Sequence, residues 1–76
     1  MTEGITDTER QIEAVLFAAE APLSVADIAR YLPDDADIGA GLAALRARYG
    51  GRGIELVERS GRWLFQTAPD LGHILR

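Results

Sequence analysis

The chain has no cysteine and no lysine, and it has a single histidine, His73. Without cysteine there can be neither a disulfide framework nor a thiolate metal site, so nothing covalent supports the core. A nucleophile paired with a base, or a metal held by imidazole and thiolate groups, cannot be assembled from these side chains. The composition therefore argues against an enzyme, and it predicts no cofactor and no metal site.

Long hydrophobic runs are also missing, because the longest uninterrupted apolar stretch is Ala14 to Ala19. A helix that spans a membrane needs about 20 such residues. The first residues do not form a basic segment followed by an apolar one, which a secretory signal would require. We therefore expect a cytoplasmic protein that has no membrane partner.

Positive charge is scarce: eight arginines stand against twelve acidic residues, giving a formal net charge of −4. Residues 1–36 hold eight acids and two arginines, whereas residues 37–76 hold six arginines and four acids. A dedicated DNA-binding domain usually carries a strong basic stripe. The densest acidic cluster, Asp34, Asp35 and Asp37, lies where a helix is expected to begin, and the helix dipole favours carboxylates there.

With 76 residues, of which 47% are hydrophobic, the chain has the size of one small domain. A domain of this size buries only about 60% of the surface of the extended chain. Its core is therefore marginal, and we expect association with a partner to stabilise it.

Three helices are predicted from apolar residues that recur with a period near 3.6. The first begins at Thr6, which has the capping-box spacing to Glu9, and ends before Pro22. The second begins at Ser24 after a short extended link, with Asp27 at its third position. The third spans residues 37–49 and ends at a glycine pair. The expected core residues are Ile12, Val15, Leu16 and Ala19 of the first helix, Val25, Ile28, Ala29 and Leu32 of the second, and Ile38, Leu42, Leu45 and Tyr49 of the third.

After the glycines the hydrophobic period changes to 2, which is typical of strands. A turn at residues 60–61 predicts a two-stranded hairpin. Arg59 and Arg62 flank this turn, and like charges that lie directly opposite each other are unfavourable. Three interpretations are open for these guanidinium groups: contact with DNA phosphates, contact with an acidic protein, or exposure to water alone. The expected core face of the hairpin carries Ile54, Leu56, Trp63 and Phe65, and the opposite face carries Val57 and Leu64.

Three helices followed by a hairpin predict an α+β fold of the winged helix-turn-helix class over residues 1–68. A further helix is expected to begin at Pro69, just inside its first turn. Its short apolar stripe has nothing to pack on. We therefore expect residues 69–76 to be the start of a linker or helix that leads to a second winged-helix domain.

In a helix-turn-helix protein the third helix would lie in the major groove and offer side chains to base edges. Base readout needs Arg, Asn, Gln, Ser or Thr near the start of that helix. Outside the core stripe, however, the third helix presents Gly39, Ala40, Ala43, Arg46 and Ala47. No sequence-specific nucleic acid partner is therefore expected, although weak, salt-sensitive contacts between arginines and DNA phosphates stay open.

Some apolar residues lie off the predicted core stripes. For Phe17 we expect core placement, because the first of three helices can be buried on two sides; the alternative is a surface for association. Val57 and Leu64 form a second apolar patch on the back of the hairpin, and such patches in a marginal domain indicate association. The candidate protein-interface residues are Phe17, Val57, Leu64, Arg59 and Arg62.

Two stretches carry a family resemblance: "IEAVLFAAEAPLSVADIARYL" and "LAALRARYGGRGIELVERSGRWLFQT". Their specific pieces are residues 12–14, 22–24 and 52–54, and the hairpin with Gly61 and Trp63 that leads to Thr67. Over residues 12–69 the chain resembles the N-terminal winged-helix domain of segregation and condensation protein B, a non-SMC subunit of the bacterial condensin complex. Trp63 stands where the family leads us to expect tyrosine, and it keeps a flat ring at that position.

The resemblance implies two tandem winged-helix domains and a homodimer formed through the first of them. It also implies binding to the kleisin subunit, segregation and condensation protein A, and through it to the SMC ATPase, in chromosome segregation at the nucleoid. The alternative interpretation is the DNA-binding winged-helix domain of a transcription regulator.

Overall fold

The computed structural model describes residues 5–75. Three α-helices precede a β-hairpin in this part of the chain, so the predicted α+β fold is confirmed. The second helix is shorter than expected, because it ends at Ala29 and the chain turns before it reaches Leu32. The elements in chain order are α1 (Asp7–Ala18), β1 (Leu23–Ser24), α2 (Val25–Ala29), α3 (Ile38–Tyr49), β2 (Ile54–Arg59), β3 (Arg62–Thr67) and the 3₁₀ helix η1 (Pro69–Leu75).

Side chains cap the helices at the predicted positions. The Ser24 hydroxyl accepts a hydrogen bond from the Asp27 N–H at 3.0 Å, and the Asp27 carboxylate accepts one from the Ser24 N–H at 3.2 Å. At the start of α3, the Asp37 carboxylate accepts a hydrogen bond from the Ala40 N–H at 3.1 Å. Each bond satisfies an amide that has no partner within the first turn of its helix.

The hairpin has the predicted register. β2 and β3 pair antiparallel from Ile54 opposite Thr67 to Arg59 opposite Arg62. The turn residues Ser60 and Gly61 have φ values of 53° and 79°. Two residues with positive φ are typical of the type I′ turn, whose twist matches that of the two strands.

A third, short strand corrects the prediction of a two-stranded sheet. β1 pairs antiparallel with β3, with Leu23 opposite Trp63 and Ser24 opposite Arg62, so the strand order is β1-β3-β2. The sequence indicated an extended link at this point, but only the tertiary fold brings that link beside β3. Pairing there covers one edge of β3 with main-chain hydrogen bonds.

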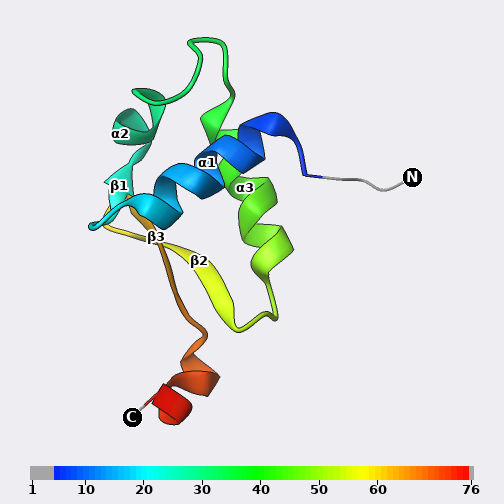
Figure 1. Cartoon of the computed structure of the whole chain (residues 1–76), viewed down its shortest axis with the longest axis vertical. Helices are drawn as coiled ribbons and strands as arrows, with labels where there is room; N and C mark the ends of the chain where they lie inside the picture. The colour runs from blue at the N-terminus through cyan, green and yellow to red at the C-terminus, as the bar shows by residue number, and fades with distance from the viewer. Residues whose placement is uncertain (1–4, 76) are drawn as a thin grey trace.

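The core lies between the three helices and one face of the sheet. In the view of Figure 1, α1 crosses in front of α3. Val15, Tyr49, Trp63 and Phe65 pack against the core with part of their surface exposed. Ile54 was expected in this core, but it is 50% exposed, because it lies at the first position of β2, at the open end of the hairpin. The buried cluster comprises Ile12, Leu16, Ile28, Leu32, Ile38, Leu42, Leu45 and Leu56.

Gly41 allows α1 and α3 to approach each other closely. A Cβ atom at this position would lie 2.6 Å from Ile12 Cδ1 and 3.2 Å from Thr8 Cγ2. The predicted stripes did not include Gly41, which is buried in the structure. Its missing side chain therefore sets the spacing between the two helices.

The expected helix after the hairpin is present as the 3₁₀ helix η1. It lies at the opposite end of the molecule from the loop that precedes α3 (Figure 1). Its attachment is local: the Ala68 N–H donates a hydrogen bond to the Gly53 carbonyl at 2.8 Å. Leu71 is half-buried, whereas Ile74 is 63% exposed. The boundary between residues 1–68 and 69–76, and a second domain beyond it, stay predictions.

Candidate protein-interaction surface

Phe17 lies on the surface, with 84% of its area exposed, so the expectation that it belongs to the core is wrong. The inner side of α1 is already occupied by Ile12 and Leu16, which face the core. Phe17 follows Leu16 directly, and a step of 100° along the helix turns its side chain away from that side. An exposed phenylalanine on a small domain is a candidate for contact with another molecule.

One side of Phe17 borders a groove with a volume of about 530 Å³, here called the Phe17 groove. Three parts of the chain form it: the outer side of α1, the end of α3 and the hairpin. Ile54, which the sequence placed in the core, lies at this groove. Its lining residues are Arg10, Glu13, Ala14, Phe17, Tyr49, Ile54 and Phe65.

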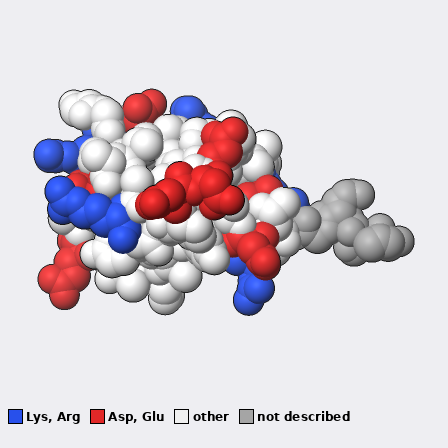
Figure 2. Space-filling model, turned by 90° about the horizontal axis from the view of Figure 1, so that it is seen from above, with Lys and Arg blue, Asp and Glu red and all other residues white. Residues whose placement is uncertain are grey.

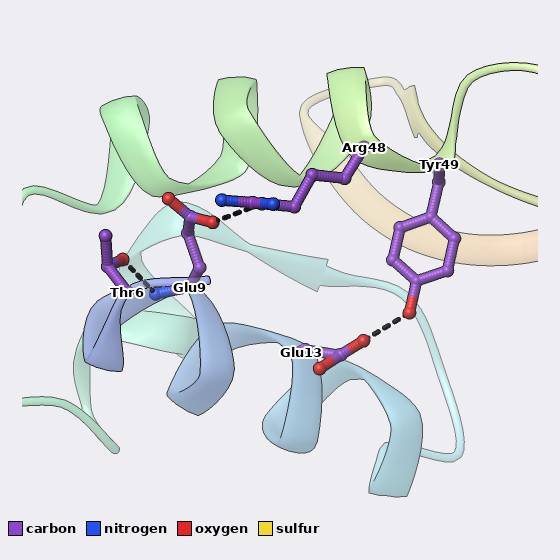
Figure 3. A network of polar contacts seen from close by, with 5 residues as sticks. All are labelled: Thr6, Glu9, Glu13, Arg48 and Tyr49. Carbon is purple, nitrogen blue, oxygen red and sulfur yellow. Dashed lines mark hydrogen bonds and ion pairs between the residues drawn. The ribbon is translucent and has the colours of Figure 1, made fainter. Parts of the chain in front are cut away.

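Aromatic rings form part of the groove wall. The ring centroids of Tyr49 and Phe65 lie 5.0 Å apart, with the planes inclined by 57°. The Tyr49 hydroxyl donates a hydrogen bond to the Glu13 carboxylate, and this contact joins α3 to α1 (Figure 3). The Glu13 carboxylate, together with burial, raises the pKa of Tyr49 above its ordinary value. Tyr49 is thus fixed as a neutral, largely apolar surface beside Phe65.

The other side of Phe17 borders a smaller groove of about 240 Å³, between the end of α1, the following link and β3. Leu64, a second predicted interface residue, lines this groove together with Glu20 and Pro22. Phe17 and Phe65 line both grooves. The two grooves therefore form one apolar surface with Phe17 as the ridge between them, here called the α1–hairpin surface.

An ion pair between a buried carboxylate on α1 and a partly exposed arginine on α3 joins these two helices. Glu9 is only 6% exposed, and its carboxylate accepts a hydrogen bond from Arg48 Nε at 2.7 Å (Figure 3). The hydrogen bond from Arg48 is the main reason why the pKa of Glu9 lies below its ordinary value. The Glu9 N–H also donates to Thr6 Oγ1 at 3.1 Å, as the capping pattern predicted.

Sequence reasoning missed the partner of Glu9. A signal for it exists, because Glu9 precedes Ile12 by three positions and Leu16 by seven, which places a carboxylate on the buried stripe of α1. A buried carboxylate needs a cation or several hydrogen-bond donors. Arg48 supplies them from α3, but its identity could not be read from local spacing.

The back face of the hairpin carries the remaining predicted interface residues. Val57 and Leu64 lie opposite each other, and both are half-buried. Arg59 Nη2 donates a hydrogen bond to Gln66 Oε1 at 2.7 Å. Because the Val57–Leu64 pair separates these two positions on the same face, the Arg59 side chain extends along the strands and away from the turn.

Arg62 is the Cα partner of Arg59, but it also has a neighbouring strand on its other side. β1 lies on its other side, with Ser24 opposite Arg62. Asp27 caps α2 beside this pair, and its pKa is lowered by the hydrogen bonds from Ser24 and, to a smaller extent, by the charges of Arg30 and Arg62. The two arginine side chains therefore have different surroundings: Arg59 is hydrogen-bonded to Gln66, and Arg62 lies on the side of β1 and Asp27.

The outward residues of α3 are exposed, as predicted. Arg46 does not extend freely into solvent, because its guanidinium lies 5.7 Å from the ring centroid of Trp63. Asp34 and Asp35 are exposed in the loop before α3, and Asp37 caps it. Figure 2 shows acidic side chains on the face that contains this end of the molecule. Carboxylates at the start of α3 repel phosphates where a recognition helix would approach DNA.

Between residues 5 and 75, His, Asp and Glu side chains nowhere gather in a group of three that could hold a metal ion. Within the same range, every helix is too short or too polar to cross a membrane.

The model of the family described as segregation and condensation complex subunit ScpB matches residues 10–76. Among curated proteins no match was found. A solved structure of a dimer of the ScpB N-terminal domain complexed with a ScpA peptide is 30% identical, with a TM-score of 0.74, and the match covers 88% of each chain.

Two longer structures share the fold. ScpB from Mycobacterium tuberculosis is 20% identical, with a TM-score of 0.79, and the match covers 99% of this chain and 49% of that one. A conserved hypothetical protein from Chlorobium tepidum is 22% identical, with a TM-score of 0.75, and the match covers 100% of this chain and 50% of that one. The present chain thus spans about half the length of these two proteins.

Proposed function

The chain belongs to the family of segregation and condensation complex subunit ScpB, as the resemblance predicted, and from this premise we propose that it is a non-catalytic subunit of the bacterial SMC condensin complex. It acts as a protein-interaction module: it forms a homodimer and binds a segment of the kleisin subunit. Through the kleisin it joins the SMC ATPase at the nucleoid, in the cytoplasm, in chromosome condensation and segregation.

The observation that carries this proposal is the relation to the ScpB N-terminal domain whose dimer is complexed with a ScpA peptide, at 30% identity over 88% of both chains. The surface of the present domain supports a role in binding other proteins. Phe17 and Ile54 are exposed at an apolar groove, and neither side chain belongs to the buried core of the domain.

The back face of the hairpin is our candidate for the kleisin contact. It combines the half-buried apolar pair Val57 and Leu64 with the guanidinium groups of Arg59 and Arg62. Charges at the edge of an apolar patch steer and orient a partner of the opposite sign. An amphipathic kleisin segment with acidic side chains beside its apolar ones fits this combination.

Sedimentation of the chain, alone and with a peptide from the kleisin subunit, tests the proposal. We expect a dimer for the chain alone and a complex of higher mass with the peptide. The variant that replaces both Arg59 and Arg62 by alanine should bind the peptide more weakly and lose part of the salt dependence of binding. A chain that stays monomeric and does not bind the peptide would contradict the proposal.

The alternative of a DNA-binding transcription regulator is disfavoured by α3. Its outward residues are mostly glycine and alanine, and carboxylates surround its start. Fluorescence anisotropy at physiological salt compares an operator-like duplex with a random one. A preference of about a thousandfold, the lower end for specific binders, would favour the regulator.

A further inference from the structure

The outer side of α1 carries a second set of residues with helical spacing, distinct from the buried stripe. Arg10, Glu13, Ala14 and Phe17 stand at positions i, i+3, i+4 and i+7, and all four line the Phe17 groove. Four residues with this spacing form the hole that receives a side chain from a facing helix in knobs-into-holes packing. Ala14 provides the space in this set, because its side chain is the smallest.

The same surface also carries the knob. Phe17 is 84% exposed and stands at the rim of the groove that it helps to form. In an isologous dimer a residue of one copy contacts a site on the other and the reverse contact is made at the same time. A knob and a hole that lie side by side on one molecule meet this requirement when the two copies are related by a twofold axis.

We propose that two copies of the chain pair through antiparallel α1 helices, with Phe17 of each copy inserted into the Phe17 groove of the other. This rests on the homodimer of the proposed function and specifies its geometry. The groove volume of about 530 Å³ leaves room for one aromatic side chain beside Tyr49 and Phe65.

The charges at the two ends of α1 favour the antiparallel arrangement. Arg10 lies in the first half of α1 and Glu20 lies just beyond its end. Antiparallel pairing brings Arg10 of one copy toward Glu20 of the other, twice in the dimer, whereas parallel pairing would bring like charges together. Arg10 is 3.6 Å from Asp7 in an exposed pair, which is worth little and leaves it available. Glu20 makes no hydrogen bond or ion pair within residues 5–75.

A second copy would have to cover more of this surface than Phe17 alone. An aromatic side chain buries about 150–250 Å². A stable interface needs about 800 Å² from each partner, roughly a seventh of the 5296 Å² surface of this domain. Phe17 alone does not supply this area, but Ile54, which is 50% exposed, lines the same groove and would be covered with it. One interface thus accounts for both apolar residues that the core leaves exposed at this groove.

Sedimentation equilibrium of single variants tests the knob. Phe17→Ala should raise the dimer dissociation constant at least about 30-fold, as expected for an interface hot spot. Ile74→Ala is the matched control, because Ile74 is also exposed, at 63%, but lies on η1. The helical circular dichroism signal should stay unchanged in both variants, since neither side chain belongs to the buried core.

A charge exchange tests the direction of pairing. Arg10→Glu and Glu20→Arg should each weaken the dimer, and the chain that carries both changes should recover the dissociation constant of the parent. Arg46→Glu, on α3, is the control that alters charge elsewhere. Because the chain has no cysteine, Ala14→Cys gives each copy a single thiol. A short cross-linker with two thiol-reactive ends should join two Ala14→Cys copies but not two Arg46→Cys copies.

The outcomes separate this geometry from the homodimer itself. A parent that dimerises while Phe17→Ala dimerises equally well, with no recovery in the exchanged pair and no cross-link at position 14, overturns the antiparallel α1 pairing and leaves the proposed homodimer intact. A parent that is monomeric at high micromolar concentration overturns both. Kleisin binding is measured separately and does not enter this test.

Discussion

The substitution Gly41→Ala probes how closely α1 and α3 must approach each other. The new methyl group would lie 2.6 Å from Ile12 Cδ1 and 3.2 Å from Thr8 Cγ2. Carbon atoms in contact prefer separations of about 3.5–4.0 Å. Ile12 is fully buried, so its side chain cannot give way without disturbing its neighbours in the core.

Two effects of opposite sign decide the result. Alanine is favoured over glycine in the interior of a helix by about 1 kcal/mol. An extra methyl group in a well-packed core costs about 1–3 kcal/mol, and the distance to Ile12 places Gly41 in the upper part of that range. We therefore expect Gly41→Ala to lower the free energy of unfolding by about 1–2 kcal/mol. For a domain of this size, each kcal/mol lowers Tm by about 4–8 °C.

Gly39→Ala is the matched control in the same helix. Gly39 is exposed, and the nearest atom to its added Cβ is Asp37 Oδ1, at 3.9 Å. This variant should keep or slightly raise the stability, because it gains helix propensity without a clash. Thermal melts followed by circular dichroism, at one fixed protein concentration, compare the two variants. If Gly41→Ala melts at or above Gly39→Ala, the close approach of the helices is refuted.

Three further variants test the core and the Glu9–Arg48 ion pair. Leu56→Ala should cost about 2–5 kcal/mol, because Leu56 is only 2% exposed, whereas Ile54→Ala should cost less than half as much in urea denaturation; equal losses would contradict the exposure of Ile54. Trp63→Ala should melt well below the parent, because the ring packs against the core; a melt close to that of the parent would mean that the ring contributes no packing. Glu9→Gln should be less stable than the parent at pH 7. The fold lowers the pKa of Glu9 from 4.5, so the stabilising effect of the Glu9 carboxylate is complete above that pH and is lost as the pH falls through the folded pKa. The difference in stability between Glu9→Gln and the parent should therefore disappear in acid. A difference in stability that stays constant from pH 7 to pH 3 would contradict the role of the Glu9–Arg48 pair.

Sequence reasoning was most successful where structure depends on neighbours along the chain. A capping side chain bonds an amide three positions away, so Ser24 and Asp27 mark the start of α2 by themselves. A two-residue turn sets the register of its hairpin, so the pairing of Ile54 with Thr67 follows from the position of Gly61. The outward residues of α3 follow in the same way from helical periodicity.

The candidate surface could be predicted only in part. Phe17 was recognisable as off the stripe of α1, but periodicity does not tell whether a second element covers that side. Ile54 has the correct strand alternation for the core and is nevertheless exposed at 50%, because no rule of alternation says how far along a strand the covering helices reach. The groove between these two residues exists only when α1, α3 and the hairpin are assembled.

The sequence by itself thus determined the three helices, the hairpin and its register, and with them the fold class, since each depends on residues close together in the chain. Two longer stretches of it also indicated the family. Only the tertiary structure decided that Glu9 pairs with Arg48, 39 positions away, that Gly41 sets the helix spacing, and that β1 joins the sheet. These contacts depend on how the elements cross in space. Local spacing carries no record of that crossing, because the same helices and strands can be packed at other distances and angles without any change in their own patterns.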